Sequence, residues 1–197
     1  MTRDRAFSLS RREFLAVAAA VSLAAVSDTD AQVPKTCAQG GTAAPTPSQT
    51  EGPYFKPNTP MRASLLEPGM PGTKLVIEGS VLTTGCKPVA RAMLDFWQAD
   101  ATGRYDNAGY RLRGHQLTDE SGRYRLETIV PAEYPGRTRH IHVKIQAPGQ
   151  PALTTQLYFP DGAENRRDSI FDPALVMRVR DTDGGRLATF DFILATR

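Results

Sequence analysis

Short hydrophobic and β-branched runs recur along the chain from residue 74 onward, separated by residues that favour turns. The clearest run is residues 74–83, KLVIEGSVLT, and five more follow at residues 93–98, 123–129, 139–146, 153–159 and 187–195. No stretch keeps a helical period, and at most residues 165–171 form a short helical turn. Short strands at this spacing, bounded by Gly, Pro and Asp, predict an all-β fold, an antiparallel β-sandwich with long loops.

Two segments that precede the first run differ from it in composition. Residues 32–60 are rich in Pro, Thr, Gly and Gln, which predicts an extended N-terminal arm in front of a β-sandwich domain at residues 61–197. Residues 1–31 contain two adjacent arginines and then an apolar run that is too short to span a bilayer core of about 30 Å. This pattern predicts a twin-arginine signal peptide and a periplasmic or secreted protein. A membrane anchor or a disordered tail is the alternative.

Composition narrows the classes of function. Hydrophobic residues make up 40% and charged residues 23%, as in ordinary globular proteins. The net charge is +3 and the basic residues are scattered, so the sequence does not favour nucleic-acid binding. Cys37 and Cys86 are the only cysteines, and an oxidising compartment favours a disulfide between them over two free thiols.

The strongest local signal for chemistry is the alternating segment 139–145, RHIHVKI. Side chains alternate along a strand, so His140 and His142 share one face, while Ile141 and Val143 point to the other. Two imidazoles at this spacing can bind one metal ion. The alternative is a solvated strand face that carries the histidines without a metal.

Tyrosines near this segment extend the possible ligand set. A phenol binds as a phenolate only where a strongly charged metal displaces its proton, and ferric iron suits phenolate with imidazole. Zinc is the rival, but it would more naturally recruit a third His or a carboxylate, and Glu133 is the one carboxylate close to the His pair. The local pattern does not separate Tyr105 from Tyr124, because each follows an Asp-x-x-Gly-Arg turn. Trp97 is expected in the core.

Five separated motifs resemble those of intradiol ring-cleavage dioxygenases, in the same order, and most closely the protocatechuate 3,4-dioxygenase branch. The likeness covers most of residues 45–195, and its motifs lie at residues 46–55, 97–105, 134–135, 137–142 and 155–159. It implies an enzyme that uses O2 to cleave a catechol-type ring between its two hydroxyl-bearing carbons, giving a muconate-type diacid. The segment before the sandwich is too short for the helical N-terminal domain of typical catechol 1,2-dioxygenases.

The resemblance also assigns roles to individual residues. It implies non-haem Fe(3+) held by four ligands: Tyr105, Tyr134, His140 and His142. Tyr134 is implied as the ligand that leaves when substrate binds, Arg137 as a cation beside the iron, and Gln156 as its supporting residue. The same resemblance places three residues of the arm against the substrate: Gly52, Pro53 and Tyr54.

Two departures from the family pattern leave the particular catechol open. The family's Tyr-Pro-Trp ends in Gly136 here, and its Pro-Ala before the His pair is Thr138-Arg139. The expected partners are a small aromatic diol and O2, with a homodimer or a related subunit as the possible assemblies. The competing interpretations are a secreted transthyretin-like β-sandwich interaction module without iron chemistry, and a zinc hydrolase.

Overall fold

The computed structural model describes Cys37 and residues 41–195. Regular structure within residues 41–195 consists of nine strands and one 3-10 helix, η1 (Pro173–Leu175). The strands are, in chain order, β1 (Lys74–Thr83), β2 (Met93–Trp97), β3 (Arg113–Leu117), β4 (Arg123–Ile129), β5 (His140–Gln146), β6 (Leu153–Tyr158), β7 (Arg178–Thr182), β8 (Gly185–Thr189) and β9 (Phe192–Leu194).

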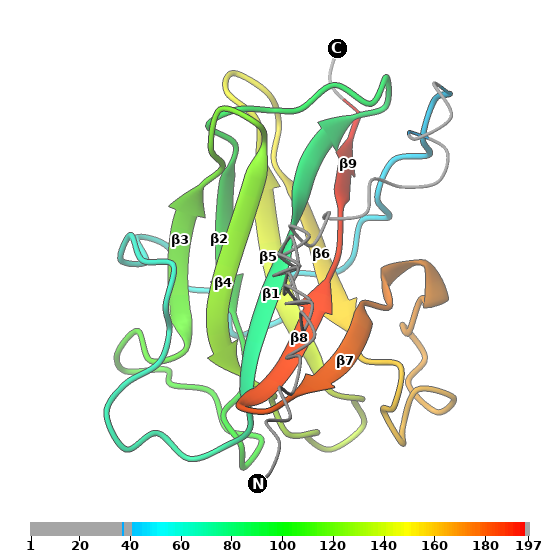
Figure 1. Ribbon diagram of the computed structural model, residues 1–197. Coiled ribbons are helices and arrows are strands. Elements are labelled where there is room, and N and C mark those ends of the chain that lie inside the picture. Colours follow the sequence, from blue (N-terminus) through cyan, green and yellow to red (C-terminus); the bar gives the residue numbers. More distant parts are fainter. Residues whose placement is uncertain (1–36, 38–40, 196–197) are drawn as a thin grey trace, which may run out of the picture.

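The strands form two facing layers (Figure 1). One sheet has the order β3-β2-β5-β6 and is antiparallel throughout. The other has the order β4-β1-β8-β7, with β9 also pairing with β1. The predicted β-sandwich is therefore confirmed. The second sheet is mixed rather than purely antiparallel, because β8 and β9 both run parallel to β1.

Two strands at sheet edges are missing from the sequence prediction. Their sequences are Arg-Gly-His-Gln-Leu for β3 and Arg-Val-Arg-Asp-Thr for β7, and neither has the hydrophobic alternation of a half-buried strand. Each lies at the end of its sheet order. The exposed charged side chains of β7 are of the kind that discourages an edge strand from pairing with another molecule, whereas β3 carries buried polar residues. Residues 165–171 form turns rather than a helix.

The predicted strand at residues 187–195 is in fact β8 and β9, separated by Phe190 and Asp191. At this break the Phe190 carbonyl approaches β1 so closely that a Cβ on Gly79 would lie 1.8 Å from its oxygen. The next N–H of β1, that of Ser80, donates to the Asp191 carboxylate at 2.8 Å. A glycine in the neighbouring strand thus permits an interruption that the sequence of residues 187–195 alone does not reveal.

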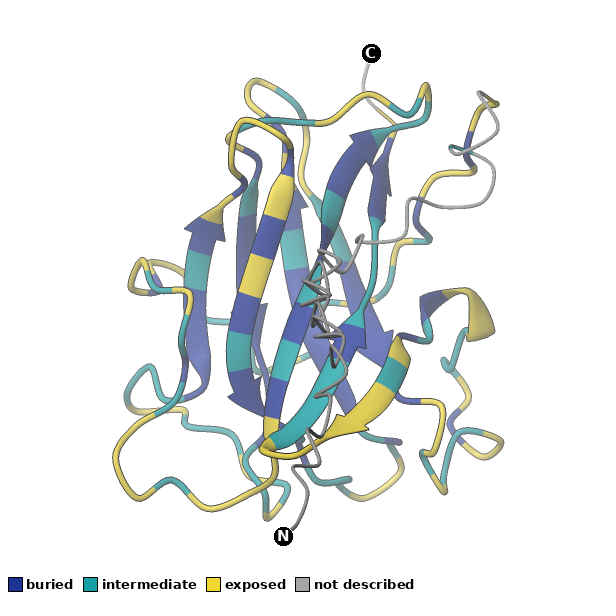
Figure 2. Ribbon diagram, in the orientation of Figure 1, coloured by how far each residue is buried: buried dark blue, intermediate teal, exposed yellow. Residues whose placement is uncertain are grey.

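Strand alternation separates the core from the outer face of the four-stranded sheet. On β5, Ile141, Val143 and Ile145 are fully buried and belong to the hydrophobic core between the sheets. Figure 2 shows the same division on β4, where buried and exposed bands alternate along the strand. His140 and His142 therefore point away from the core, to the outer face of their sheet.

The arm covers that outer face within residues 41–60. The N–H of Gln49 donates to the Thr154 carbonyl at 2.8 Å, which anchors the arm to β6. Further along, the Phe55 ring lies edge-on to Trp97 of β2, with ring centroids 5.0 Å apart. The Nζ atom of Lys144 on β5 lies 3.7 Å from the centroid of the Phe55 ring. Residues on this face of the sheet are thus enclosed by the arm rather than by solvent.

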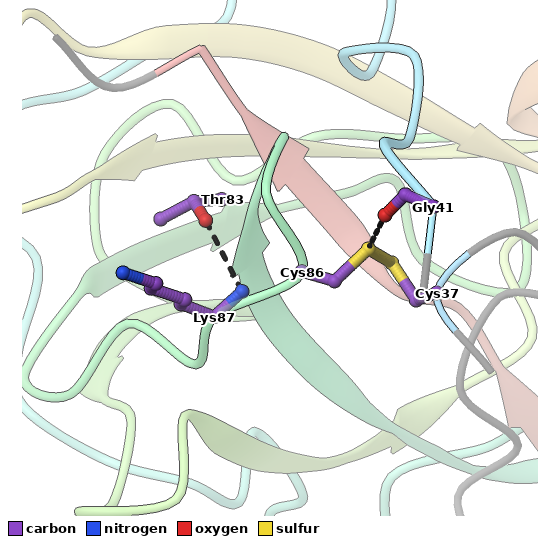
Figure 3. The surroundings of a disulfide bond; sticks show 5 residues. All are labelled: Cys37, Gly41, Thr83, Cys86 and Lys87. Atoms are coloured by element: carbon purple, nitrogen blue, oxygen red, sulfur yellow. Dashed lines mark hydrogen bonds between the residues drawn. A yellow bond between two sulfur atoms is a disulfide. The ribbon is translucent and has the colours of Figure 1, made fainter. Parts of the chain in front are cut away.

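A disulfide ties the start of the arm to the end of β1 (Figure 3). Cys37 and Cys86 are joined with Cα atoms 5.3 Å apart. Beside the bridge, the N–H of Lys87 donates to the Thr83 hydroxyl at 3.1 Å, which closes the turn that carries Cys86. The predicted signal peptide lies outside the described residues, so it stays a prediction. In the described part of the chain, no helix has the length and apolar character needed to cross a membrane.

Candidate metal centre

The two histidines of β5 meet at one point on the outer face of the sheet. His140 and His142 are only 2% and 1% exposed, so they do not line a solvated face. Their Nε2 atoms lie 3.1 Å apart. Two nitrogens that each bind one ion at about 2.1 Å, at a right angle, are separated by about 3 Å. The pair therefore has the spacing of two ligands to a single metal ion.

Neighbouring groups fix both imidazoles as neutral rings. Nδ1 of His140 lies 2.7 Å from the Thr138 carbonyl and donates to it, which leaves a lone pair on Nε2 for a metal. The Trp97 ring stacks on His142 with centroids 4.8 Å apart and planes 6° apart. Trp97 is buried as predicted, at 1% exposed, but its ring packs against the site and lies outside the main hydrophobic cluster between the sheets. Burial and the nearby Arg137 cation lower the pKa of His140 to about 4, and burial lowers the pKa of His142 as well.

Tyr105 and Tyr134 complete a cluster with the two histidines. The Tyr134 ring centroid lies 5.5 Å from that of His140, the Tyr105 ring lies 6.3 Å from that of His142, and the two phenol rings are 5.9 Å apart. The Tyr105 hydroxyl is buried and has no hydrogen-bond partner. Burial raises the pKa of both phenols, with the Tyr134 group adding to the effect on Tyr105.

Tyr124, which shares the local pattern of Tyr105, lies elsewhere. Its ring belongs to the hydrophobic core, and its hydroxyl donates to the Phe190 carbonyl at 2.9 Å. Among the described residues, no group of three or more His, Cys, Asp or Glu side chains is arranged to hold a metal ion. Tyr158 also lies beside His140, with ring centroids 6.2 Å apart, but its hydroxyl donates to Gln156 Oε1 and to the Ile170 carbonyl. The phenols of Tyr105 and Tyr134, together with the two imidazoles, form a set that suits a hard, highly charged ion better than zinc.

A polar network supports the site on the side of Tyr134. Arg137 donates from Nη1 to the Tyr134 hydroxyl at 3.3 Å and from Nη2 to Gln156 Oε1 at 2.5 Å. Its Nε pairs with Asp168 at 2.9 Å, and the Asp168 side chain is 1% exposed. Tyr158 donates to Gln156 Oε1 at 3.1 Å. Arg137 and Gln156 therefore touch each other and the cluster, within a network that fixes the guanidinium.

Asp168 and Tyr158 are absent from the sequence prediction. No local signal identifies Asp168, because it reaches Arg137 across a separation of 31 residues. Tyr158 has a readable signal, because it lies two residues from Gln156 on one strand face. The register pairs these two residues with His140 and His142.

Two of the three predicted pocket residues contact the cluster. Gly52 has φ of +70°, and a Cβ at this position would lie 3.4 Å from Cε1 of His142, so the arm passes directly over that ring. The Tyr54 ring stacks on Tyr105 with centroids 4.3 Å apart. Pro53 is exposed. The arm thus contributes an aromatic side chain and a close backbone approach to the same site.

The departures from the family pattern lie on the loop that carries Tyr134. Gly136 is exposed, has φ of +81°, and a Cβ there would meet no atom within 4 Å. Arg139 is half-buried, with its Nε 3.9 Å from Glu133 Oε1. The position of the family's tryptophan is therefore open space in this protein.

Known proteins share this architecture. A family model described as Dioxygenase matches residues 50–195. The dioxygenase domain of a dioxygenase carbohydrate-binding protein fusion from Streptomyces sp. SirexAA-E is 56% identical with a TM-score of 0.77, over 78% of this chain and 100% of that one. The 3-chlorocatechol 1,2-dioxygenase of Rhodococcus opacus 1CP is 31% identical with a TM-score of 0.72, over 77% and 73%.

Curated relatives are similar over shorter stretches. The catechol 1,2-dioxygenase of Candida albicans is 29% identical over 64% of this chain and 51% of its own length. The chain spans about half the length of several of the curated relatives that it matches. The similarity therefore concerns the sandwich and its site rather than the whole of those proteins.

Proposed function

Because the chain belongs to the intradiol ring-cleavage dioxygenase family, we propose that it opens a catechol-type ring between the two hydroxyl-bearing carbons. In that reaction both atoms of one O2 molecule enter a ring-opened, muconate-type diacid, so no external reductant is needed. The observation that supports this proposal most strongly is that two imidazoles from β5 and two phenols from separate loops meet in one cluster. The family match does not favour a transthyretin-like module without chemistry.

The four side chains fit a ferric ion, Fe(3+). Tyr105, Tyr134, His140 and His142 offer two nitrogens and two oxygens around one point, and the Tyr105 hydroxyl lacks any other partner. Phenols whose pKa is raised by burial give up their protons only to a strongly charged ion. A ferric ion held there would supply Lewis acidity toward the two oxygens of the diol.

The surrounding residues then have defined tasks. Arg137 is held by Asp168 and Gln156, so its positive charge is already in place to stabilise negative charge on the diol oxygens. Tyr134 would keep a hydrogen-bond partner even without a metal bond, because Arg137 donates to its hydroxyl. The arm excludes water from the opposite side, where Tyr54 covers Tyr105.

The wider setting is also proposed. The composition of residues 1–31 supports export by the twin-arginine route, with the mature protein in the periplasm or outside the cell. Amino-terminal sequencing of protein recovered from a periplasmic fraction tests this route. The partners would be a small aromatic diol and O2, and the enzyme would work as a homodimer or beside a related subunit. Open space at Gly136 makes that side of the site permissive toward substituents on the ring.

Product analysis under ¹⁸O2 tests the reaction. Iron-loaded protein with catechol is expected to give a diacid that contains two labelled oxygens. Tyr105→Phe and Tyr134→Phe each remove one ligand and are expected to lose turnover, whereas Tyr124→Phe serves as a matched control because its hydroxyl lies in the core. A semialdehyde product from cleavage beside the diol, or no turnover of any catechol by iron-loaded wild type, contradicts the proposal.

A further inference from the structure

Arg113 is a fully buried arginine at the start of β3, on the same face of the sheet as the metal cluster. It stands opposite Trp97 in the β2-β3 register, and Trp97 stands opposite His142 in the β2-β5 register. Its side chain therefore enters the layer between sheet and arm. Fully burying an arginine is costly unless the charge has a specific partner.

The partners of Arg113 belong to two different segments. Its Nη1 donates to the Tyr54 carbonyl of the arm at 2.6 Å. Its Nε donates to the Asp106 carbonyl at 3.0 Å, in the residue that follows Tyr105. The guanidinium carbon lies 5.9 Å from the centroid of the Tyr105 ring. One rigid, forked group thus joins the backbone that carries Tyr54 to the backbone that carries Tyr105.

Among the described residues, no acidic side chain forms a hydrogen bond with the Arg113 guanidinium. Its hydrogen bonds within the described residues go to backbone carbonyls, and its Nη2 is buried without any partner. Arg137, by contrast, is paired with Asp168. A buried, incompletely satisfied cation is expensive if its only purpose is to hold the fold. Its position beside an aromatic ring that would bind metal as an anion offers a functional reason for that cost.

We propose that Arg113 is a positioning residue that locks the arm onto the Tyr105 loop and so fixes the stack of Tyr54 on Tyr105. This inference rests on the proposed function, because Tyr105 is taken as a metal ligand and Tyr54 as a wall of the substrate pocket. Arg113 itself touches neither the diol nor the reacting atoms. It acts by holding two groups that do.

Substitution of Arg113 by Met, Lys and Gln tests the inference. Arg113→Met keeps an unbranched, flexible apolar side chain but removes the guanidinium and with it both hydrogen bonds. It is expected to weaken iron binding about 10- to 100-fold, the range found when partners that orient metal ligands are lost. The visible absorption band and the KM for catechol are both expected to change. Arg113→Lys can reach only one of the two carbonyls and is expected to recover part of the loss.

Arg62 offers a matched control in the same region. It is a partly buried arginine, and like Arg113 its guanidinium donates to backbone carbonyls, in this case those of Tyr110 and Arg113. Arg62→Met is expected to lower the melting temperature without changing the visible band or KM. If Arg113→Met and Arg62→Met lose only stability, and to the same extent, Arg113 is a structural residue and the inference is wrong.

A double-mutant cycle with Tyr54→Ala asks whether Arg113 acts through the arm. The losses in iron affinity are expected to be far from additive, because each change breaks the same stack. Additive losses overturn the inference. Arg113→Gln, which keeps one donor, replaces the Met variant if the latter does not fold.

Hydrogen exchange of the iron-free protein separates this inference from the proposed function. Backbone amides of the arm near Tyr54 are expected to exchange faster in Arg113→Met than in wild type or Arg62→Met, whether or not iron ever binds. A wild-type protein that takes up no iron rejects the proposed function. Unchanged arm exchange in Arg113→Met rejects the role of Arg113.

Discussion

Asp168→Asn tests the network that holds Arg137. The Asp168 carboxylate accepts from Arg137 Nε at 2.9 Å, from the Thr138 N–H at 3.0 Å and from the Ile170 N–H at 3.1 Å. An amide of the same shape must place its own N–H groups against at least one of these donors. Breaking a buried ion pair by neutralising one partner costs about 3–5 kcal/mol, and the lower value applies because the Arg137 side chain is 16% exposed.

A loss of about 3 kcal/mol corresponds to a fall in melting temperature of about 6–12 °C for a domain of this size. Urea denaturation of the iron-free variant at pH 7 measures the stability directly. The freed guanidinium no longer holds Gln156 and Tyr134 in place, so kcat for catechol is expected to fall about tenfold or more. Asp172→Asn is the control, because that half-buried carboxylate caps η1 by accepting from the Ala174 N–H. If both variants stay within about 0.5 kcal/mol of wild type, the network is not fixed by Asp168.

Three further predictions address the core, the disulfide and the metal. Tyr124→Phe is expected to cost about 1 kcal/mol at pH 8, because the Phe190 carbonyl loses its donor. Burial raises the pKa of Tyr124 in the folded protein, so the phenol loses its proton more readily when the chain unfolds. The free energy of unfolding of wild type therefore falls as the pH rises above 10. Urea denaturation at pH 8 and 10.5 should show a smaller fall in the free energy of unfolding for Tyr124→Phe. Cys86→Ser opens a loop with a sequence separation of 49 and is expected to cost about 4 kcal/mol, measured by calorimetry against wild type with the disulfide intact. Removing iron with a chelator should lower the melting temperature and restore it on addition of ferric salt, because only the folded chain gathers the four ligands.

Alternation along strands made much of the fold predictable from the sequence. Residues 139–145 show this best, because the same pattern that places Ile141 and Val143 in the core places both histidines at the site. The edge strand β7 escaped prediction because most of its residues are exposed, and β3 escaped because polar residues, among them the buried Arg113 and Gln116, replace the hydrophobic ones that would mark a strand. The break between β8 and β9 escaped because its cause is Gly79 on another strand.

The site itself depends on contacts that sequence distance conceals. Tyr105 and Tyr124 follow the same turn pattern, yet one ring faces His142 and the other lies in the core. The local sequence pattern is the same around both tyrosines, so only the packing of segments distant in sequence determines which ring lies at the site. Resemblance to a family supplied that choice in advance, whereas Asp168 and Arg113 emerge only from the three-dimensional contacts.

The visible spectrum of the purified, iron-loaded mature protein, recorded before and after addition of catechol, tests the central claim most directly. Two phenolates bound to ferric iron are expected to give a red-brown absorption band that shifts when the diol binds and is lost in Tyr105→Phe. A protein that stays colourless and free of iron after reconstitution with ferric salt contradicts the assignment of Tyr105, Tyr134, His140 and His142 as an iron site.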